Sequence, residues 1–487
     1  MQKKFILITI VLGLSVVLAL SSPDAHQARS ADVRDFPNLD SIIEANMVYG
    51  HLPGVQACAI KDGEVIWQGA YGYARLSDSM EVTDTTIFNI ASISKTVTSV
   101  ALMQLWEHGY FNLDDDINEH LSFEVHNPWY PTDSITPRML LTHTSSIWDR
   151  WTILDTLISL GDSTLTLREF CEQYLCLGGT WYSMMNFGNY LPSTHYGYSN
   201  IGLTLVGHLV EAVSNSPDGY FVQHCEDSIF TPLGMNRTCW LMCDVDTNQM
   251  AMSYYTTGSP SPVGYISTPI YPAASLKTTA VELANFLSAF QNYGQLGTVT
   301  ILDSTTVEDI TTIQYPSVTT ERGLGWWFIT FDGRELWGHH GGPLMGHTCE
   351  MWFCRADNSG AIVLSNGDYG AYSRNATMAI TDALLDYALE YGINELKIQT
   401  PKLDFITCAP NPFTTTTEVT YIIPMETHVR ITVHNAAGQR VVTLVDTRQT
   451  AGTYSISWDG KRLPNGVYIC RMETDNCPET QKILLIR

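Results

Sequence analysis

The chain has 487 residues, long for a single ordinary domain and sufficient for two or three. Hydrophobic residues make up 45% of it, and 50 acidic against 26 basic residues give a formal net charge of −24. So acidic a chain repels phosphate backbones, which excludes nucleic acid from the expected partners.

Residues 1–21 have the pattern of a secretory signal peptide. Lys3 and Lys4 precede an apolar run over residues 5–20, and small residues lie at its end. The run is shorter than the roughly 20 residues that a membrane-spanning helix needs. We therefore expect an exported protein, secreted or at the cell surface, without a stable transmembrane anchor.

Residues 37–395 mix strand and helix signals. Two antiparallel strands are expected at residues 55–60 and 64–73, with helices after Ser92 and Asn200. Later strands are expected at residues 323–330, 335–338, 349–354 and 360–366, before a closing helix at residues 376–391. The pattern predicts an α+β domain in which helices flank an antiparallel sheet.

A linker is expected at residues 396–407, between this domain and a C-terminal segment of different composition. Residues 408–487 contain short alternating strands with turn signals about every ten residues. This spacing predicts a small all-β, immunoglobulin-like sandwich as the C-terminal domain.

Ser92 and Lys95 are the first candidates for catalysis. A serine hydroxyl needs a base to remove its proton before it can act as a nucleophile. Residues three apart lie on the same face of a helix, so Lys95 can reach the Ser92 oxygen if Ser92 opens one. A buried lysine can lose its charge and accept that proton.

The chain also contains eleven cysteines, an odd number that leaves at least one unpaired. Cys171 with Cys176, and Cys239 with Cys243, have spacings that suit zinc, but no complementary pair completes either site. We expect no metal.

Several segments resemble the serine β-lactamase and penicillin-binding superfamily, and most of all the class C β-lactamases, their D-Ala-D-Ala peptidase relatives and related esterases. Residues 88–95 (FNIASISK) resemble its nucleophile segment, and residues 198–203 (YSNIGL) its Tyr-x-Asn element. Residues 140–146 (LLTHTSS) resemble its Leu-Leu-x-His-Thr-Ser-Gly segment, with Ser146 replacing the glycine. The resemblance spans roughly residues 40–395 and implies a β-lactamase/transpeptidase-like fold.

The resemblance assigns roles to the second segment. A phenol beside a lysine ammonium can have its pKa lowered, so Tyr198 is expected to share the proton transfers with Lys95. The Asn200 amide is expected to orient Lys95 and to bind a substrate carbonyl. His143, in residues 140–146, is interpreted as a structural histidine.

The family's third motif is Lys-Thr-Gly or His-x-Gly on a strand, and here two registers compete. With His340 first, Pro343 occupies the position that donates to the oxyanion, but proline has no N–H. With His339 first, Gly342 donates, at the cost of one extra residue before Gly346. We favour the second register, because a lost oxyanion donor costs about 2.7–4 kcal/mol of barrier lowering. His339 or His340 is then expected to orient substrate.

The C-terminal domain resembles the secretion-sorting domains found at the ends of many exported bacterial proteins. The resemblance rests on residues 409–413 (APNPF), 458–460 (WDG) and 466–468 (GVY). It implies that secretion machinery recognises this domain.

Together these observations predict a secreted serine hydrolase that cleaves an ester or amide through a Ser92 acyl-enzyme. Its substrate is expected to be a small molecule or peptide (a D-amino-acid peptide, an ester or a β-lactam), and it needs no cofactor. Two alternatives remain: a penicillin-recognition or scaffold protein that is acylated without turnover, and a surface adhesin that acts through its C-terminal domain.

Overall fold

The computed structural model describes residues 39–342, 346–368, 370–399, 406–423, 427–436, 438–474 and 478–487. The predicted signal peptide lies outside these residues, as does Pro343.

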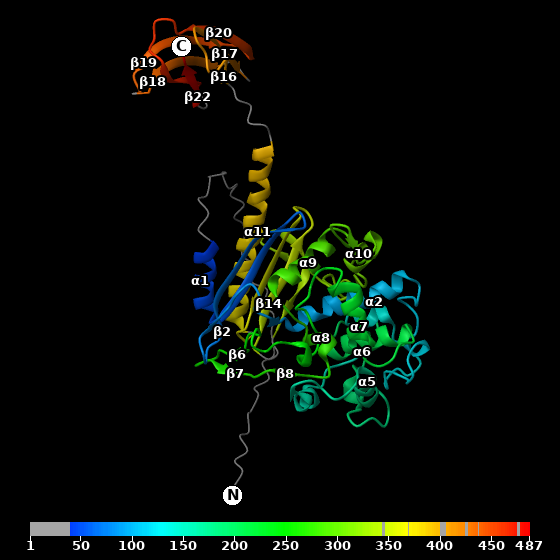
Figure 1. The fold of residues 1–487 in the computed structure, drawn as a ribbon. Helices are drawn as coiled ribbons and strands as arrows, with labels where there is room; N and C mark the ends of the chain where they lie inside the picture. The colour runs from blue at the N-terminus through cyan, green and yellow to red at the C-terminus, as the bar shows by residue number, and fades with distance from the viewer. Residues whose placement is uncertain are drawn as a thin grey trace, which may run out of the picture.

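A seven-stranded sheet forms the centre of the larger domain, and each of its strand pairs is antiparallel (Figure 1). In spatial order the strands are β12 (Trp327–Phe331), β13 (Arg334–Gly341), β14 (Thr348–Cys354), β15 (Ser359–Ser365), β1 (Gly54–Lys61), β2 (Glu64–Arg75) and β3 (Met80–Glu81). The antiparallel sheet predicted from the sequence is therefore confirmed.

Helices cover both faces of this sheet. Helices α1 (Leu39–Gly50) and α11 (Ala371–Gln399) pack on one face of the sheet. Helix α9 (Ala280–Gln291) packs on the other face, on the side where the remaining helices lie (Figure 1). The remaining helices are α2 (Ser94–Glu107), α3 (Pro137–Leu141), α4 (Trp151–Leu154), α5 (Leu167–Leu175), α6 (Asn200–Val213), α7 (Tyr220–Cys225), α8 (Tyr271–Ala274) and α10 (Ser304–Ile310).

Successive side chains of a strand point to opposite faces, and this alternation gives the domain two cores. In β1, Val55 and Ala57 pack in the core against α1 and α11, whereas Cys58 and Ile60 pack in the larger core on the α9 side. The sheet is thus covered on both faces, and every residue of β14 and β15 is buried, Glu350 included.

Two predicted boundaries differ from the structure. The strand expected from Gly323 begins only at Trp327, because Gly325 has a φ of +73°, outside the extended region. The closing helix expected at residues 376–391 extends in both directions to form α11.

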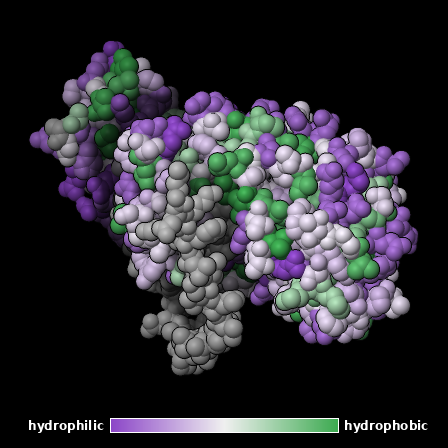
Figure 2. Space-filling view, turned by 90° about the horizontal axis from the view of Figure 1, so that it is seen from below, coloured by the Kyte–Doolittle hydropathy of each residue, from purple (hydrophilic) through white to green (hydrophobic). Residues whose placement is uncertain are grey.

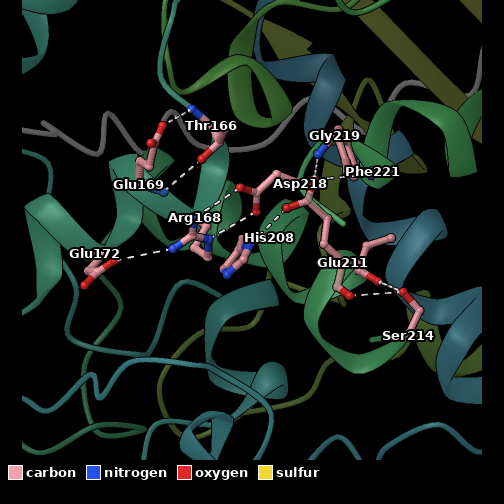
Figure 3. A network of polar contacts seen from close by, with 11 residues as sticks. Thr166, Arg168, Glu169, Glu172, His208, Glu211, Ser214, Asp218, Gly219 and Phe221 are labelled. Carbon is pink, nitrogen blue, oxygen red and sulfur yellow. Dashed lines mark hydrogen bonds and ion pairs between the residues drawn. The ribbon is translucent and has the colours of Figure 1, made fainter. Parts of the chain in front are cut away.

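Buried Glu211 near the end of α6 fixes the chain that follows it (Figure 3). Its carboxylate accepts hydrogen bonds from the backbone N–H groups of Gly219 at 2.8 Å and Phe221 at 3.4 Å. The other carboxylate oxygen lies 3.0 Å from His208 Nδ1. These contacts hold the start of α7 against α6, the helix that begins with Asn200.

Four short two-stranded sheets complete this domain. They pair β4 (Phe88–Asn89) with β9 (Lys277–Thr278), β5 (Ser159–Leu160) with β8 (Ile266–Ser267), β6 (Tyr254–Tyr255) with β7 (Ser261–Pro262), and β10 (Gln295–Leu296) with β11 (Val299–Thr300). Strand β4 ends three residues before Ser92.

The C-terminal residues form two further antiparallel sheets around a core of their own. One contains β16 (Ile406–Ala409), β17 (Thr416–Ile423) and β20 (Gly452–Asp459). The other contains β19 (Arg440–Gln449), β18 (Thr427–Asn435), β21 (Gly466–Glu473) and β22 (Pro478–Leu485). The predicted fold class, an α+β domain followed by an all-β domain, is confirmed.

Across the described ranges, every helix is too short or too polar to span a membrane. On the face shown in Figure 2, hydrophobic side chains lie in separate patches between hydrophilic ones.

Candidate active site

Ser92 lies where β4 turns into α2. A single 3₁₀ turn, Ala91–Ile93, connects the two elements. Ala91 has a φ of +47°, a conformation that costs free energy in a residue with a side chain and that recurs at functional sites. The Asn89 side-chain oxygen accepts a hydrogen bond from the Ala91 N–H at 2.8 Å and stabilises this turn. The turn presents the Ser92 hydroxyl at the start of a buried helix.

Lys95, one turn further along, is completely buried. Its Nζ lies 3.0 Å from Ser92 Oγ, 2.7 Å from Asn200 Oδ1 and 2.7 Å from the Ala273 carbonyl oxygen. Burial lowers the pKa of Lys95 from 10.5 to about 7, against the opposing effect of the Asp149 charge. A substantial fraction of this amine is therefore neutral near pH 7 and can accept a proton.

Tyr198 contacts the same hydroxyl. Its Oη donates a hydrogen bond to Ser92 Oγ at 2.9 Å, and its ring centroid lies 4.9 Å from Lys95 Nζ. The expected lowering of its pKa is wrong: desolvation raises the pKa of Tyr198, and the hydrogen bond to Ser92 offsets this only in part. At neutral pH Tyr198 is therefore a protonated phenol, and of the two groups Lys95 is the one that can accept a proton.

Asn200 begins α6 and has a fixed orientation. Its Nδ2 donates to Asp149 at 2.7 Å, so its Oδ1 faces Lys95. Asp149 also accepts from the backbone N–H groups of Asn200 at 2.9 Å and Ile201 at 3.0 Å. A carboxylate is favourable at this helix N-terminus, where backbone N–H groups lack helical partners.

Sequence reasoning missed Asp149, and one signal could have found it. That signal is its position, because Asp149 is an acidic residue only three positions after the family-like segment at residues 140–146. His143 in that segment supports the site, as predicted: its Nδ1 accepts from the Ser199 N–H at 3.1 Å, and its ring packs 4.4 Å from the Tyr198 ring.

The two histidines of β13 lie on opposite faces of the sheet. His339 pairs across the sheet with Met351, which belongs to the core on the α9 side, and its ring lies 6.5 Å from that of Tyr198. His340 pairs with Glu350, whose carboxylate contacts Thr377 of α11. The structure therefore places His339 on the face of Tyr198 and His340 on the face of Glu350 and α11, while both rings contact Trp327, at centroid distances of 4.5 and 4.7 Å.

The end of β13 lies directly against the nucleophile segment. A Cβ on Gly341 would stand 2.3 Å from the Ile90 carbonyl oxygen, so only glycine fits there. The pairing with β12 ends at Gly338, which leaves His339 to Gly341 without a β12 partner. Gly342 follows the strand, in the position expected for the second oxyanion donor, whereas the rival donor position, Pro343, lies outside the described residues.

Within the described ranges, no group of three or more His, Cys, Asp or Glu side chains could hold a metal ion. Cys171, Cys176, Cys239 and Cys243 are free thiols. Cys239 Sγ lies 3.7 Å from the Leu241 carbonyl oxygen, and Cys243 Sγ lies 3.6 Å from Asp244 Oδ1.

The Beta-lactamase family model matches residues 39–385, which is more than half of the chain. The chain belongs to the Beta-lactamase family. The model of the FlgD Ig-like domain matches residues 414–476, in agreement with the sandwich of β16 to β22.

Curated relatives match less of the chain. Protein flp of Staphylococcus aureus strain N315 is 26% identical over 258 residues, which cover 51% of this chain and 47% of that protein. Beta-lactamase-like protein 2 of Dictyostelium discoideum is 24% identical over 326 residues, covering 63% of this chain and 56% of that protein. The chain thus spans about half the length of the curated relatives it matches.

Solved structures share the fold at low identity. A penicillin-binding protein homologue from Pyrococcus abyssi has a TM-score of 0.56 at 21% identity, covering 92% of this chain and 96% of its own. The hydrolase EstCE1 has a TM-score of 0.58 at 19% identity, covering 71% and 97%. The D-amino acid amidase of Ochrobactrum anthropi SV3 has a TM-score of 0.56 at 21% identity, covering 73% and 99%. The likeness to these structures shows that the chain shares their fold.

Proposed function

We propose that the chain hydrolyses an ester or amide through a covalent acyl-enzyme on Ser92. The observation that carries this proposal is the hydroxyl of Ser92 between two proton-transfer groups, Lys95 Nζ at 3.0 Å and Tyr198 Oη at 2.9 Å. The two groups have pKa values displaced in opposite directions, one lowered and one raised. Such a displacement separates the base from the acid at a single pH.

In the acylation step, neutral Lys95 takes the proton of Ser92 while Ser92 Oγ forms a bond to the substrate carbonyl carbon. The tetrahedral intermediate collapses, and the bond to the leaving group breaks. Tyr198 gives its phenolic proton to that leaving group and recovers a proton from the Lys95 ammonium, 4.9 Å from its ring centroid. Lys95 is then neutral again.

Backbone N–H groups of Ser92 and Gly342 hold the negative oxygen of the intermediate in this proposal. Ser92 lies in the first turn before α2, where N–H groups have no helical acceptor. Gly342 follows the strand whose end lies against Ile90. In deacylation, water attacks the ester carbon and gives its proton to Lys95. The bond to Ser92 Oγ then breaks as Lys95 returns that proton to Oγ, 3.0 Å away, and the acid product leaves.

Substrate class is tested with a panel of short p-nitrophenyl esters, D-amino-acid peptides and nitrocefin, on the wild type and Ser92→Ala. We expect ester or peptide turnover to exceed nitrocefin turnover, because His339 stands where a permanently charged lysine would hold a β-lactam carboxylate. Burial lowers the pKa of His339 well below 6.5, so this imidazole is uncharged at neutral pH. Activity that persists in Ser92→Ala would reject the proposal.

We also propose that the chain is exported and that the C-terminal domain is recognised by secretion machinery. The signal-peptide pattern of residues 1–21 and the motifs of residues 409–413 and 466–468 support this. Deleting residues 406–487 should leave hydrolysis intact and block release of the enzyme from the cell. Normal export of the truncated chain would reject the sorting role.

A further inference from the structure

Two cysteines meet inside the C-terminal sandwich. Cys408 lies on β16, in one sheet, and Cys470 lies on β21, in the other. Both side chains belong to the same hydrophobic core and are buried, Cys470 completely. The thiol of Cys470 makes a side-chain hydrogen bond with the sulfur of Cys408. Two thiols from opposite sheets therefore already face each other in the middle of this domain.

Tyr468 fixes the strand that carries Cys470. Its Oη donates to the Pro464 carbonyl oxygen at 2.8 Å, which ties the start of β21 to the turn before it. Its ring centroid lies 5.4 Å from that of Trp458 on β20, in the opposite sheet. Two residues further along, Cys470 pairs with Val433 of β18. A side chain in so closely packed a strand has little freedom to turn away from its partner.

The chain around Cys408 is held in a similar way. Cys408 pairs with Val419 of β17 within its own sheet. A few residues later, the Phe413 N–H donates to the Leu484 carbonyl oxygen of β22 at 2.9 Å, which ties the segment after β16 to the other sheet. The backbones on both sides of the thiol pair are thus fixed by contacts that do not involve the thiols.

A pair of thiols in contact can bind a metal or be oxidised. A structural zinc takes four ligands, and in the part of the chain that the structure describes no cluster of three or more His, Cys, Asp or Glu side chains could hold a metal ion. A disulfide needs only the two sulfurs and side chains that converge. Small exported domains have limited cores and are commonly cross-linked in this way.

We propose that Cys408 and Cys470 form a disulfide that links the two sheets of the C-terminal domain and stabilises it. This inference is independent of hydrolysis at Ser92. In the cell it requires an oxidising compartment, which the proposed export supplies.

The bond forms by thiol–disulfide exchange, and the oxidant is a small-molecule or enzyme disulfide of that compartment. The Cys408 thiolate attacks one sulfur of the oxidant, forms a mixed disulfide and releases one thiol. Cys470 then loses its proton, attacks the Cys408 sulfur and expels the second thiol. The protein loses two electrons and two protons, and the oxidant is reduced to two thiols.

The two cysteines have different roles in this exchange. The hydrogen bond from Cys470 lowers the pKa of Cys408, so Cys408 ionises first and is the attacking group. Burial limits the access of an oxidant to both sulfurs once the sandwich has closed. The exchange is therefore expected while the domain folds.

Peptide mapping tests the pairing directly. The full chain is refolded in a glutathione redox couple, alkylated without reduction and digested with trypsin, which cuts after Arg471 and so separates Cys470 from Cys477. We expect the peptides of Cys408 and Cys470 to be linked, to lack two hydrogens and to separate on reduction. Alkylation of both thiols, or linkage of either one to another cysteine, overturns the inference. Refolding in vitro makes this result independent of export, and the map of the wild type needs no variant.

Calorimetry of the full chain tests the stabilising role. Reduction with a phosphine should lower the melting temperature of the C-terminal domain by roughly 10–20 °C, because the bond closes a long loop of the unfolded chain. Cys408→Ser and Cys470→Ser should lack this reductant-dependent shift. Cys477→Ser is the matched control from the same C-terminal segment and should keep it. Equal midpoints for the oxidised and reduced wild type, or a shift that Cys477→Ser abolishes, overturn the inference.

Discussion

Asp149 accepts two hydrogen bonds from Asn200, one from its backbone N–H at 2.9 Å and one from Nδ2 at 2.7 Å. This pair fixes which end of the amide faces Lys95, and it places a negative charge near the amine. Asp149 therefore acts on the reaction through Lys95 and Asn200 and is a positioning residue.

Asp149→Asn should lower kcat/KM about 10- to 100-fold, because Asn200 is no longer held in one orientation. The charge of Asp149 raises the pKa of Lys95, in opposition to burial. Removing that charge should therefore move the acid limb of the pH–rate profile to lower pH. A merely structural role predicts lower activity with the midpoint unmoved.

The pH dependence of the wild type follows from Lys95 as the base. Its neutral form is the active one, so kcat/KM for an uncharged ester should rise with pH and level off above about 7. The profile from pH 5 to 9 checks this. A rate that falls as the pH rises through about 7 would mean that another group is the base.

Tyr198→Phe removes the phenol that donates to Ser92 and should lower turnover about 10²- to 10⁴-fold. The described contact of this hydroxyl is with Ser92, so the melting temperature should change little. Steady-state kinetics and thermal unfolding of the same sample measure both. Turnover equal to that of the wild type would remove Tyr198 from the proton transfers.

Gly341→Ala places a Cβ 2.3 Å from the Ile90 carbonyl oxygen, so β13 or the nucleophile segment must move. A shift of about 1 Å can cost about 100-fold in rate, which is the loss we expect in kcat/KM.

Gly202→Ala is the control for this prediction. Its new Cβ would meet only atoms at 3.5 Å or more, in ordinary contact, although Gly202 lies in α6 beside Asn200. It should retain activity. Equal activity of the two alanine variants would show that the contact between Gly341 and Ile90 does not position Ser92.

Local signals in the sequence were enough to predict that Ser92 and Lys95 lie together and that an all-β region follows an α+β domain. Ser92 and Lys95 meet because they are one helical turn apart, and the turn at Asp62 and Gly63 joins two antiparallel strands as expected. Asp62 and Gly63 both have positive φ, which glycine adopts without a Cβ clash and which aspartate tolerates.

The remaining features depend on contacts between distant segments. Asp149 reaches Asn200 from 51 positions away, and Cys408 meets Cys470 of the opposite sheet. The raised pKa of Tyr198 depends on burial, which a motif does not reveal. Which histidine faces the site is decided by the pairing of β13 with β14, because a shift of one residue exchanges the two faces.

The central claim is that Ser92 forms the covalent intermediate, and peptide mapping by mass spectrometry tests it most directly. After exposure to a fluorophosphonate, the wild type should carry one adduct, on the peptide that contains Ser92. Ser92→Ala should carry none under the same conditions. An adduct on another residue, or equal labelling of Ser92→Ala, would contradict the account.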